Sequence, residues 1–348
     1  MQIPPETGST TMNVTDTTTA REGFGSIRQG GLRWDSLPMR LFAGGNKKFW
    51  NPADLDFSQD AADFAEMEGP LQKLTCVLAT LFIAGEEAVT EDIQPFMKAM
   101  AAEGRLEDEM FLTQFAFEEA KHTQAFRLWL DAVGVDNDLH ELIEGCEGYR
   151  TIFYDELPKA LRRLEHDHSP EAQIRASVVY NHIVEGTLAL TGYYAWNRIC
   201  ERRGIFPGMR KLIYHIGADE RRHMAWGTFT CRRHVAADKT MWDLVQQTME
   251  ELTPHAIDVT YYPFTQIDVD ELDLEALQQE GEDLDQLIHE FANYATDRMG
   301  RRLNAIETAL ELSPEDIEVD RRPEELEEQF AKEDEQAFKA RVAAGQVH

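Results

Sequence analysis

The sequence predicts an all-α protein whose core is a bundle of four long helices. Four long stretches, at about residues 70–101, 105–133, 170–203 and 207–237, have the composition and apolar spacing of helices. No run of any length alternates between apolar and polar residues, as a half-buried strand would. The chain has 348 residues, of which 43% are hydrophobic, and this is enough for a sizeable core in one large domain or two ordinary ones.

Glycine and proline mark the ends of these helices. Gly104 and Gly134 follow the first and second stretches, whereas Pro170 falls in the first turn of the third stretch and Gly204 ends it. The first stretch is apolar almost all round near its middle, so we expect it to be central. One or two further helices fill residues 138–166.

The two ends of the chain differ from the bundle. Residues 1–30 are rich in Thr, Ser, Gly and Pro without periodicity, so we expect disorder there. We expect the helical domain to span residues 31–312, beginning with an ordered lead-in over residues 31–69. From Ile267 onward acidic helical segments alternate with breaks, and we predict a solvated, acidic tail over residues 313–348 that is partly helical or disordered.

The charge of the chain excludes some partners. The formal net charge is −30, with 64 acidic and 34 basic residues, and such a surface repels nucleic acids and anionic membranes. The longest mostly apolar run, residues 76–85, is too short to span a bilayer, and the N-terminus lacks a secretory signal. The four cysteines are widely spaced and form no Cys-x-x-Cys pair, so we expect free thiols and a cytoplasmic location.

Two helices carry the same Glu-x-x-His spacing. It joins Glu119 to His122 in the second helix and Glu220 to His223 in the fourth, and residues i and i+3 share one face of a helix. A single such motif often arises by chance on a surface. Both copies lie in apolar helices, however, and a buried carboxylate beside an imidazole is costly unless something compensates it. Two copies therefore indicate a shared role.

The other two long helices each carry a glutamate within an apolar stretch. The first helix offers Glu86 or Glu87, which helix geometry barely separates, and the third offers Glu185. Four carboxylates and two imidazoles can hold two divalent first-row metals, because the carboxylates neutralise four positive charges and imidazole suits iron and manganese. This pattern is typical of ferritin-like di-iron and di-manganese carboxylate proteins, so we predict a ferritin-like four-helix bundle core with additional helices.

Two neighbours of the predicted ligands have more than one interpretation. His182 lies three residues before Glu185 and could compete as a ligand, but we favour a core position or one behind the ligands. Asp219 precedes Glu220 and could either accept a hydrogen bond from a ligand histidine or face solvent.

Five segments of the chain together resemble a known family. They are GGLRWDSLPMRLFAGGNKKFWNPADLDFSQD, GEEAVTEDIQPF, FAFEEAKHTQAF, YNHIVEGTLALTGYY and DERRHMAWG. Over roughly residues 30–310 the chain resembles the small subunit of class I ribonucleotide reductase, and more closely the related ligand-binding oxidases, which use a mixed manganese–iron centre. The resemblance implies an O₂-dependent oxidase with one Mn and one Fe, or two Fe as the alternative. It places the metal ligands at Glu86, Glu119, His122, Glu185, Glu220 and His223.

The resemblance also implies an ether cross-link between Val89 and Tyr180. Val89 lies one helical turn after Glu86, so it can face the metals. Tyr180 precedes Glu185 by five residues, which rotates the two side chains apart by about 140° on a regular helix. A local distortion of the helix would bring both to the metals.

The related oxidases bind a long-chain fatty acid with its carboxylate on the metals. The resemblance further places Trp50 and Asp219 near one ligand histidine, where we favour structural hydrogen bonding, and related proteins are usually homodimers. The electron donor is unknown. Four residues of the third helix could line a channel for the fatty acid or simply pack in the core: Leu188, Leu190, Tyr193 and Tyr194.

Two alternatives remain open from the sequence. The first is the radical-generating small subunit of a Mn/Fe ribonucleotide reductase. Phe126 stands where many such subunits have a tyrosine, and the end of the chain, ARVAAGQVH, lacks the tyrosine with which reductase subunits dock. The second is a ferritin-like metal-binding or storage bundle without redox turnover on organic substrates.

Overall fold

The computed structural model describes residues 23–67, 69–266 and 284–347. The chain divides into two units, Met1–Arg33 and Trp34–His348. Within the described part of the first unit, one 3₁₀ turn covers Gly25–Ile27. The predicted disorder of residues 1–30 falls mostly outside the described residues.

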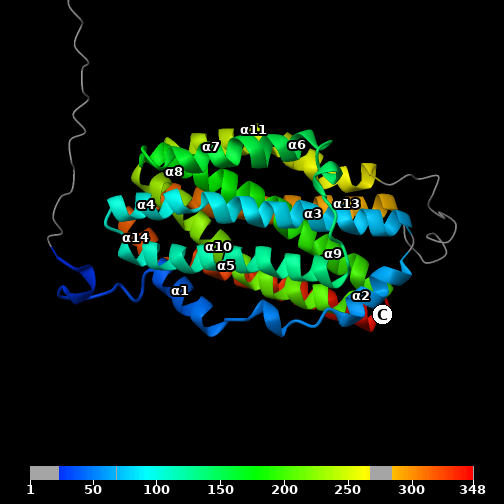
Figure 1. The fold of residues 1–348 in the computed structure, drawn as a ribbon. Coiled ribbons are helices and arrows are strands. Elements are labelled where there is room, and N and C mark those ends of the chain that lie inside the picture. Colours follow the sequence, from blue (N-terminus) through cyan, green and yellow to red (C-terminus); the bar gives the residue numbers. More distant parts are fainter. Residues whose placement is uncertain (1–22, 68, 267–283, 348) are drawn as a thin grey trace, which may run out of the picture. The chain divides into compact units, whose positions relative to one another are not determined.

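The second unit holds the predicted bundle. Its four long members are α3 (Gly69–Asp92), α5 (Leu106–Ala132), α10 (Pro207–Ala237) and one interrupted helix. The interrupted helix runs through α8 (Pro170–Ser177), the π-helix η5 (Val178–Ala189) and α9 (Leu190–Arg203). In Figure 1, α3 and α5 run side by side across the bundle, and α10 contacts both α5 and η5.

One predicted helix is divided in the structure. The sequence predicts a continuous helix over residues 70–101, whereas α3 ends at Asp92 and α4 covers Gln94–Ala102. Pro95 lies in the first turn of α4. A proline has no N–H to donate and its ring collides with the carbonyl four residues earlier, so the helix breaks before it.

Further helices surround the four, and the described residues include no strand, which confirms the all-α prediction. No helix was predicted for residues 241–265, where the structure has α11 with Pro254 and Pro263 inside it.

No described helix is both long enough and apolar enough to cross a membrane. The four cysteines are free, and all but Cys76 are buried. The additional helices are α1 (Leu37–Lys47), α2 (Ser58–Glu66), α6 (Glu147–Tyr149), the π-helix η4 (Arg150–Glu156), α7 (Leu157–Arg163), α11 (Met241–Thr265), α13 (Leu284–Glu307), α14 (Pro314–Val319) and α15 (Arg322–Ala343), with 3₁₀ turns at Pro52–Asp54, His140–Leu142 and Thr308–Glu311.

The C-terminal helices differ from the predicted solvated tail. α14 buries Ile317, and α15 buries Pro323, Glu327 and Phe330 against the bundle. α15 packs on α10 and α13. The sequence shows α15 as polar on most faces, but arginines of α1 and α13 pair with four of its acids, and this pairing is not visible from the helix alone.

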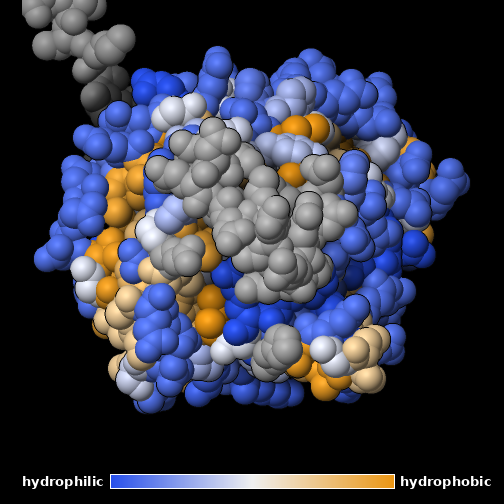
Figure 2. Space-filling view, turned by 90° about the vertical axis from the view of Figure 1, so that its right-hand side faces the viewer, coloured by the Kyte–Doolittle hydropathy of each residue, from blue (hydrophilic) through white to orange (hydrophobic). Residues whose placement is uncertain are grey.

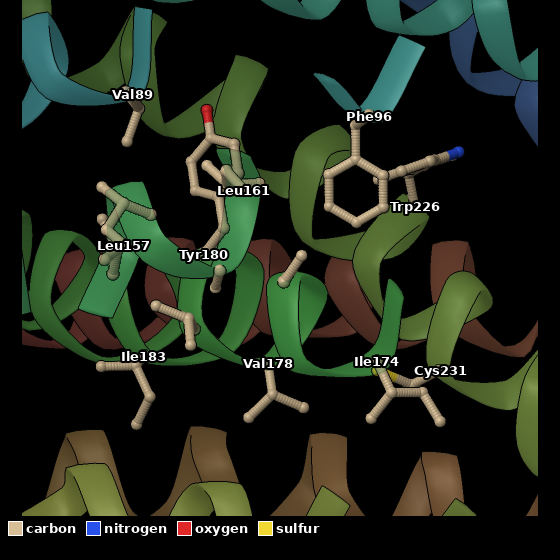
Figure 3. Close-up of a cluster of buried hydrophobic side chains, with 14 of the residues drawn as sticks. Val89, Phe96, Leu157, Leu161, Ile174, Val178, Tyr180, Ile183, Trp226 and Cys231 are labelled. Carbon is tan, nitrogen blue, oxygen red and sulfur yellow. The ribbon is translucent and has the colours of Figure 1, made fainter. Parts of the chain in front are cut away.

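Two clusters of buried side chains form the core. The larger contains Val89, Tyr180 and Trp226, which Figure 3 shows together with the aliphatic residues of α8 and η5. The smaller surrounds Trp129 and Trp196. Replacing one such aromatic residue with alanine typically costs about 3–5 kcal/mol, so these clusters hold the bundle, and the ligands on it, in place.

Candidate metal centre

The bundle brings all six predicted ligands together. One ligand set comes from each long member: Glu86 from α3, Glu119 and His122 from α5, Glu185 from η5, and Glu220 and His223 from α10. Among the described residues they form two groups whose ligand atoms all lie within 4.8 Å of one another. The first group contains Glu86 and His122, the second contains Glu185 and His223, and both contain Glu119 and Glu220.

The first group, the His122 half, surrounds Nδ1 of His122. This atom lies 3.4 Å from Oε2 of Glu86, 3.6 Å from Oε2 of Glu119 and 3.3 Å from Oε1 of Glu220. Ligand atoms that surround one ion at about 2.1 Å lie about 3 Å apart or slightly more. The His122 half therefore has the spacing that one metal ion requires.

The second group, the His223 half, has the same form. Nδ1 of His223 lies 3.0 Å from Oε1 of Glu119, 3.6 Å from Oε1 of Glu185 and 3.4 Å from Oε2 of Glu220. Glu119 and Glu220 thus turn one oxygen toward each histidine. This is the geometry of carboxylates that bridge two ions.

Six polar atoms of the candidate ligands lack hydrogen-bond partners among the described residues. All six side chains are buried, although a buried polar group without a partner is costly and rare. Two divalent cations would satisfy every one of these atoms and neutralise the four carboxylates, so the donor set fits a dimetal centre. The unpartnered atoms are both oxygens of Glu119, Oε1 of Glu185, Oε2 of Glu220 and Nδ1 of His122 and His223.

The ionisable groups confirm that the centre needs positive charge. Burial raises the pKa of Glu86 to about 8 and that of Glu185 well above its usual value. Burial alone would also raise the pKa of Glu119, but the proximity of His122 and His223 holds it below its usual value. The surrounding carboxylates overcome burial and raise the pKa values of His122 and His223. Binding metal must displace these protons.

The outer nitrogen of each histidine meets a carboxylate from the opposite motif. Nε2 of His122 on α5 lies 3.3 Å from Oδ2 of Asp219 on α10, and Nε2 of His223 on α10 lies 2.9 Å from Oε2 of Glu118 on α5. Such carboxylates fix the orientation of a ligand histidine. Trp50 donates its indole N–H to Asp219 at 2.8 Å. Asp219 is buried, so its hydrogen-bonding alternative is correct and the solvent-facing one is wrong.

Sequence reasoning missed Glu118, Arg222 and Lys121. Arg222 donates to Glu118 at 2.6 Å and to Asp219 at 2.7 Å, so it joins the two supporting carboxylates. Lys121 donates to Asp219 at 2.9 Å and lies 4.4 Å from the centre of the Trp50 ring. A signal for Glu118 was present, since an acidic residue directly precedes both Glu-x-x-His motifs.

The π-helix explains how Tyr180 and Glu185 share a face. In η5 the backbone N–H of Leu190 donates to the carbonyl of Glu185, five residues earlier, and this wider turn brings residues i and i+5 into line. The hydroxyl of Tyr180 is buried without a hydrogen-bond partner among the described residues. In Figure 3 it lies on the same side of the cluster as Val89. The helix distortion that the sequence required is therefore present.

An apolar cavity of about 110 Å³ opens from the four carboxylates. Its walls include Val89, Leu188, Val259 and Phe291, with Glu86, Glu119, Glu185 and Glu220 at one end. The cavity follows one helical face of η5 and α9, through residues 185, 188, 192, 195 and 199.

Three of the four predicted channel residues do not line this cavity. Leu190 belongs to the smaller core cluster, around Trp129. The hydroxyl of Tyr193 instead donates to Oε1 of Glu86 at 2.8 Å, and that of Tyr194 donates to Glu290 on α13 at 2.6 Å. Only Leu188 lines the cavity, because the other three positions fall outside the helical face that residues 185, 188, 192, 195 and 199 form.

The remaining alternatives are also decided by burial and position. Glu86 is 5% exposed and faces the centre, whereas Glu87 is exposed to solvent. His182 is buried, and its Nε2 lies 3.9 Å from Sγ of Cys231 rather than in either ligand group. Phe126 is buried and stacks on Phe82 with ring centres 5.5 Å apart.

The fold and the site together define a class, that of ferritin-like helical proteins with a dimetal-carboxylate site. Residues 40–304 match the family described as ribonucleotide reductase, small chain. A solved structure of an R2-like ligand-binding oxidase with an aerobically reconstituted Mn/Fe cofactor is 38% identical, with a TM-score of 0.76, over 82% of this chain and 98% of that one. A point variant of such an oxidase, also with an Mn/Fe cofactor, is 37% identical over 82% and 99% of the two chains, with a TM-score of 0.75. This chain belongs to the small-chain family of ribonucleotide reductase and, within it, to the R2-like ligand-binding oxidases.

Proposed function

We propose that this protein is a dimetal-carboxylate oxidase that uses O₂ at a Mn/Fe centre to carry out two-electron oxidations. The observation that carries the proposal is the convergence of six buried ligands, five of which have polar atoms without a hydrogen-bond partner among the described residues, beside an apolar cavity. The similarity to oxidases with a Mn/Fe cofactor supports the choice of metals.

The ligands divide the work between them. Glu119 and Glu220 would each offer one oxygen to each of two ions, and Glu86 with His122 and Glu185 with His223 would complete one ion each. When bound, the metal pair supplies the electrons that reduce O₂. Asp219 and Glu118 hold the outer nitrogens of the histidines, so that each Nδ1 points to a metal.

Val89 and Tyr180 would be the first side chains that this centre oxidises. The ether cross-link removes one hydrogen from the Val89 side chain and one from the Tyr180 hydroxyl, and it forms one C–O bond. The two electrons and two protons pass to the reduction of O₂. Burial raises the pKa of Tyr180 well above its usual value, so the phenol keeps its proton until it is oxidised.

The cavity suits the chain of a fatty acid or another hydrophobic molecule, with a carboxylate at the metals. A cavity of 150 Å³ holds one benzene, so a volume of about 110 Å³ must widen to admit a long acyl chain. Leu188 and Phe291 are wall residues that would move. Solvent extraction of the purified protein followed by mass spectrometry should release such a ligand, and a protein that yields none would contradict this part of the proposal.

The first experiment is peptide mass spectrometry on protein loaded with Mn(II) and Fe(II) and exposed to air. We expect a joined species containing Val89 and Tyr180 that is two hydrogens lighter than the two peptides summed. The variant Tyr180→Phe, which binds metal through the same six ligands, is the matched control and should give only separate peptides.

The absence of the joined species, with both metals bound, would contradict the oxidase proposal. It would favour the reductase subunit or a non-oxidising metal bundle instead. Molecular mass in solution separates these further, because storage requires a hollow cage whereas we predict a homodimer. A cytoplasmic location also remains a prediction.

A further inference from the structure

One buried ion pair links the C-terminal helix α15 to the segment that carries the candidate ligand Glu185. Glu327 of α15 is 3% exposed and Arg302 of α13 is 1% exposed. Arg302 donates from Nε to Oε1 of Glu327 at 2.6 Å and from Nη2 to Oε2 at 2.8 Å. Two parallel hydrogen bonds of this kind fix the plane and position of the guanidinium group.

The third nitrogen of Arg302 contacts the π-helix. Nη1 donates to the backbone carbonyl of Gly186 at 3.2 Å, and Gly186 directly follows the ligand Glu185. A Cβ atom at Gly186 would lie 2.9 Å from the carbonyl oxygen of Asn181 and 3.6 Å from Nη1 of Arg302. The glycine therefore leaves the space in which the π-turn and the arginine approach each other.

The π-helix needs support from outside itself. Such helices are rare, because their backbone geometry is less favourable than that of an α-helix, and η5 extends over twelve residues. Asn181 supports Glu185 from within the helix by donating to its Oε2 at 2.9 Å. Arg302 adds a charged donor on the backbone of the next residue.

Further contacts with α13 and α9 fix the position of α15 and therefore of Glu327. Glu333 accepts hydrogen bonds from Arg298 and Arg301, and the ring of Phe330 lies 4.3 Å from Cζ of Arg298. Arg341 donates to Glu201 of α9 at 3.0 Å. Both α14 and α15 lie beyond residues 40–304, which match the reductase small-chain family.

We propose that α15 positions the metal ligand Glu185. Glu327 fixes Arg302, and Arg302 holds the carbonyl of Gly186, so that η5 keeps Oε1 of Glu185 directed toward His223. Glu327 and Arg302 are positioning residues, since neither touches the ligand atoms. This inference rests on the proposed function, because it takes Glu185 as a metal ligand.

The test compares Glu327→Gln with Glu333→Gln. Each variant removes one acid of α15 that pairs with an arginine of α13. Arg298 and Arg301, which pair with Glu333, have all their ion-pair partners on α13 and α15, whereas Arg302 also contacts η5. In metal-free protein, hydrogen exchange over residues 178–189 should become faster in Glu327→Gln and stay unchanged in Glu333→Gln. In a metal titration, Glu327→Gln should bind the second metal about tenfold more weakly or worse.

A second variant keeps the test decisive if Glu327→Gln does not fold. Arg302→Lys keeps the charge that neutralises Glu327. One ammonium group, however, cannot donate hydrogen bonds to both oxygens of Glu327 and to the carbonyl of Gly186 at once. It should show the same two changes. Equal exchange and equal metal affinity in these variants and in Glu333→Gln would overturn the inference. A wild-type protein that binds fewer than two metals would instead contradict the proposed function, while the exchange data would still test the support of η5.

Discussion

The His122 half and the His223 half of the centre share two glutamates but have different surroundings. In the His122 half, Glu86 comes from a regular α-helix and accepts a hydrogen bond from Tyr193. The polar network behind His122 continues through Asp219 to Lys121, which lies 5.8 Å from the ring centres of the exposed Phe49 and Phe117. The hydrogen-bond network behind this half therefore ends at a buried lysine beside two exposed aromatic rings.

The His223 half is enclosed instead. Glu185 comes from a π-helix, and the ring of His223 stacks on the buried Phe115 with ring centres 3.6 Å apart. Two metal positions with the same ligand types thus differ in the charge, hydrogen bonding and packing behind the ligands. Such differences tune the affinity of a site, so the comparison shows how nearly symmetric motifs can offer unequal positions to two different metals.

The largest effect should come from a ligand that both halves share. Glu220→Ala removes one oxygen from each half and should abolish the binding of both metals, whereas Glu185→Ala should spare the metal of the His122 half. Elemental analysis of desalted protein measures the metals per chain. Glu87→Ala, one position from Glu86 but exposed, is the control and should bind both. A Glu220→Ala protein that retains one metal would show that this residue does not bridge.

The supporting carboxylates should separate the two halves. Asp219→Asn should weaken the metal of the His122 half, and Glu118→Gln that of the His223 half, each by about 10–100-fold, because the histidine loses the carboxylate that orients it. Competition titration gives the affinities, and anomalous diffraction shows which position is depleted. If both variants deplete the same metal position, the contacts of Asp219 with His122 and of Glu118 with His223 do not distinguish the two halves.

Acid should destabilise the His223 half through His182, which lies in η5. Burial, followed by the charge of Arg302, lowers the pKa of His182 to about 3 in the folded protein. In an unfolded chain His182 binds this proton near pH 6.5, so His182 alone should lower the free energy of unfolding by about 1.4 kcal/mol per pH unit from pH 6.5 toward pH 3. Urea unfolding of metal-free protein measures the slope.

The variant His182→Gln isolates this contribution, since it cannot titrate. Its stability should depend less on pH than that of the wild type over the same range. His215, which stacks on Trp50 in the His122 half, is only partly buried, so His215→Gln should change the slope less. Equal slopes in the wild type and His182→Gln would contradict the prediction.

The smallest effect should come from the hydrogen bond on Glu86. Tyr193→Phe removes one donor and should weaken the metal of the His122 half by about 1 kcal/mol, or about fivefold, without affecting the His223 half. Tyr194→Phe is the matched control, because the Tyr194 hydroxyl donates to Glu290 of α13 instead. Metal titration of both variants provides the test, and an equal loss in the two would mean that the bond to Glu86 is not responsible.

Much of the centre could be predicted from the sequence because helix periodicity is local. The spacing of Glu119 to His122 and of Glu220 to His223 places each pair on one face whatever surrounds the helix. The acid before each motif was equally visible, yet its contact with the histidine of the other helix was not, because that contact depends on how α5 and α10 are juxtaposed.

The channel residues and the C-terminal region could not be predicted from the pattern of a single helix. Leu190 and Tyr194 could have lined a channel or packed in the core, and tertiary contacts decided this: Leu190 packs in the smaller core cluster, and the Tyr194 hydroxyl donates to Glu290 of α13. The acids of residues 313–348 suggested a solvated tail, because an acidic helix read alone has no reason to be buried. Three of these acids, Glu327, Asp320 and Glu318, instead pair with Arg302 of α13, Arg232 of α10 and Arg105 just before α5, all more than 20 positions away in sequence.

The sequence by itself predicted the all-α class, the four long helices and five of the six candidate ligands, since composition and i, i+3 spacing act within one helix. Only the tertiary structure decided between Glu86 and Glu87, buried the hydroxyl of Tyr180 and linked α15 to the residue after Glu185. These outcomes depend on burial, on a distorted backbone and on charges brought together from distant segments, and each becomes defined only when the helices pack.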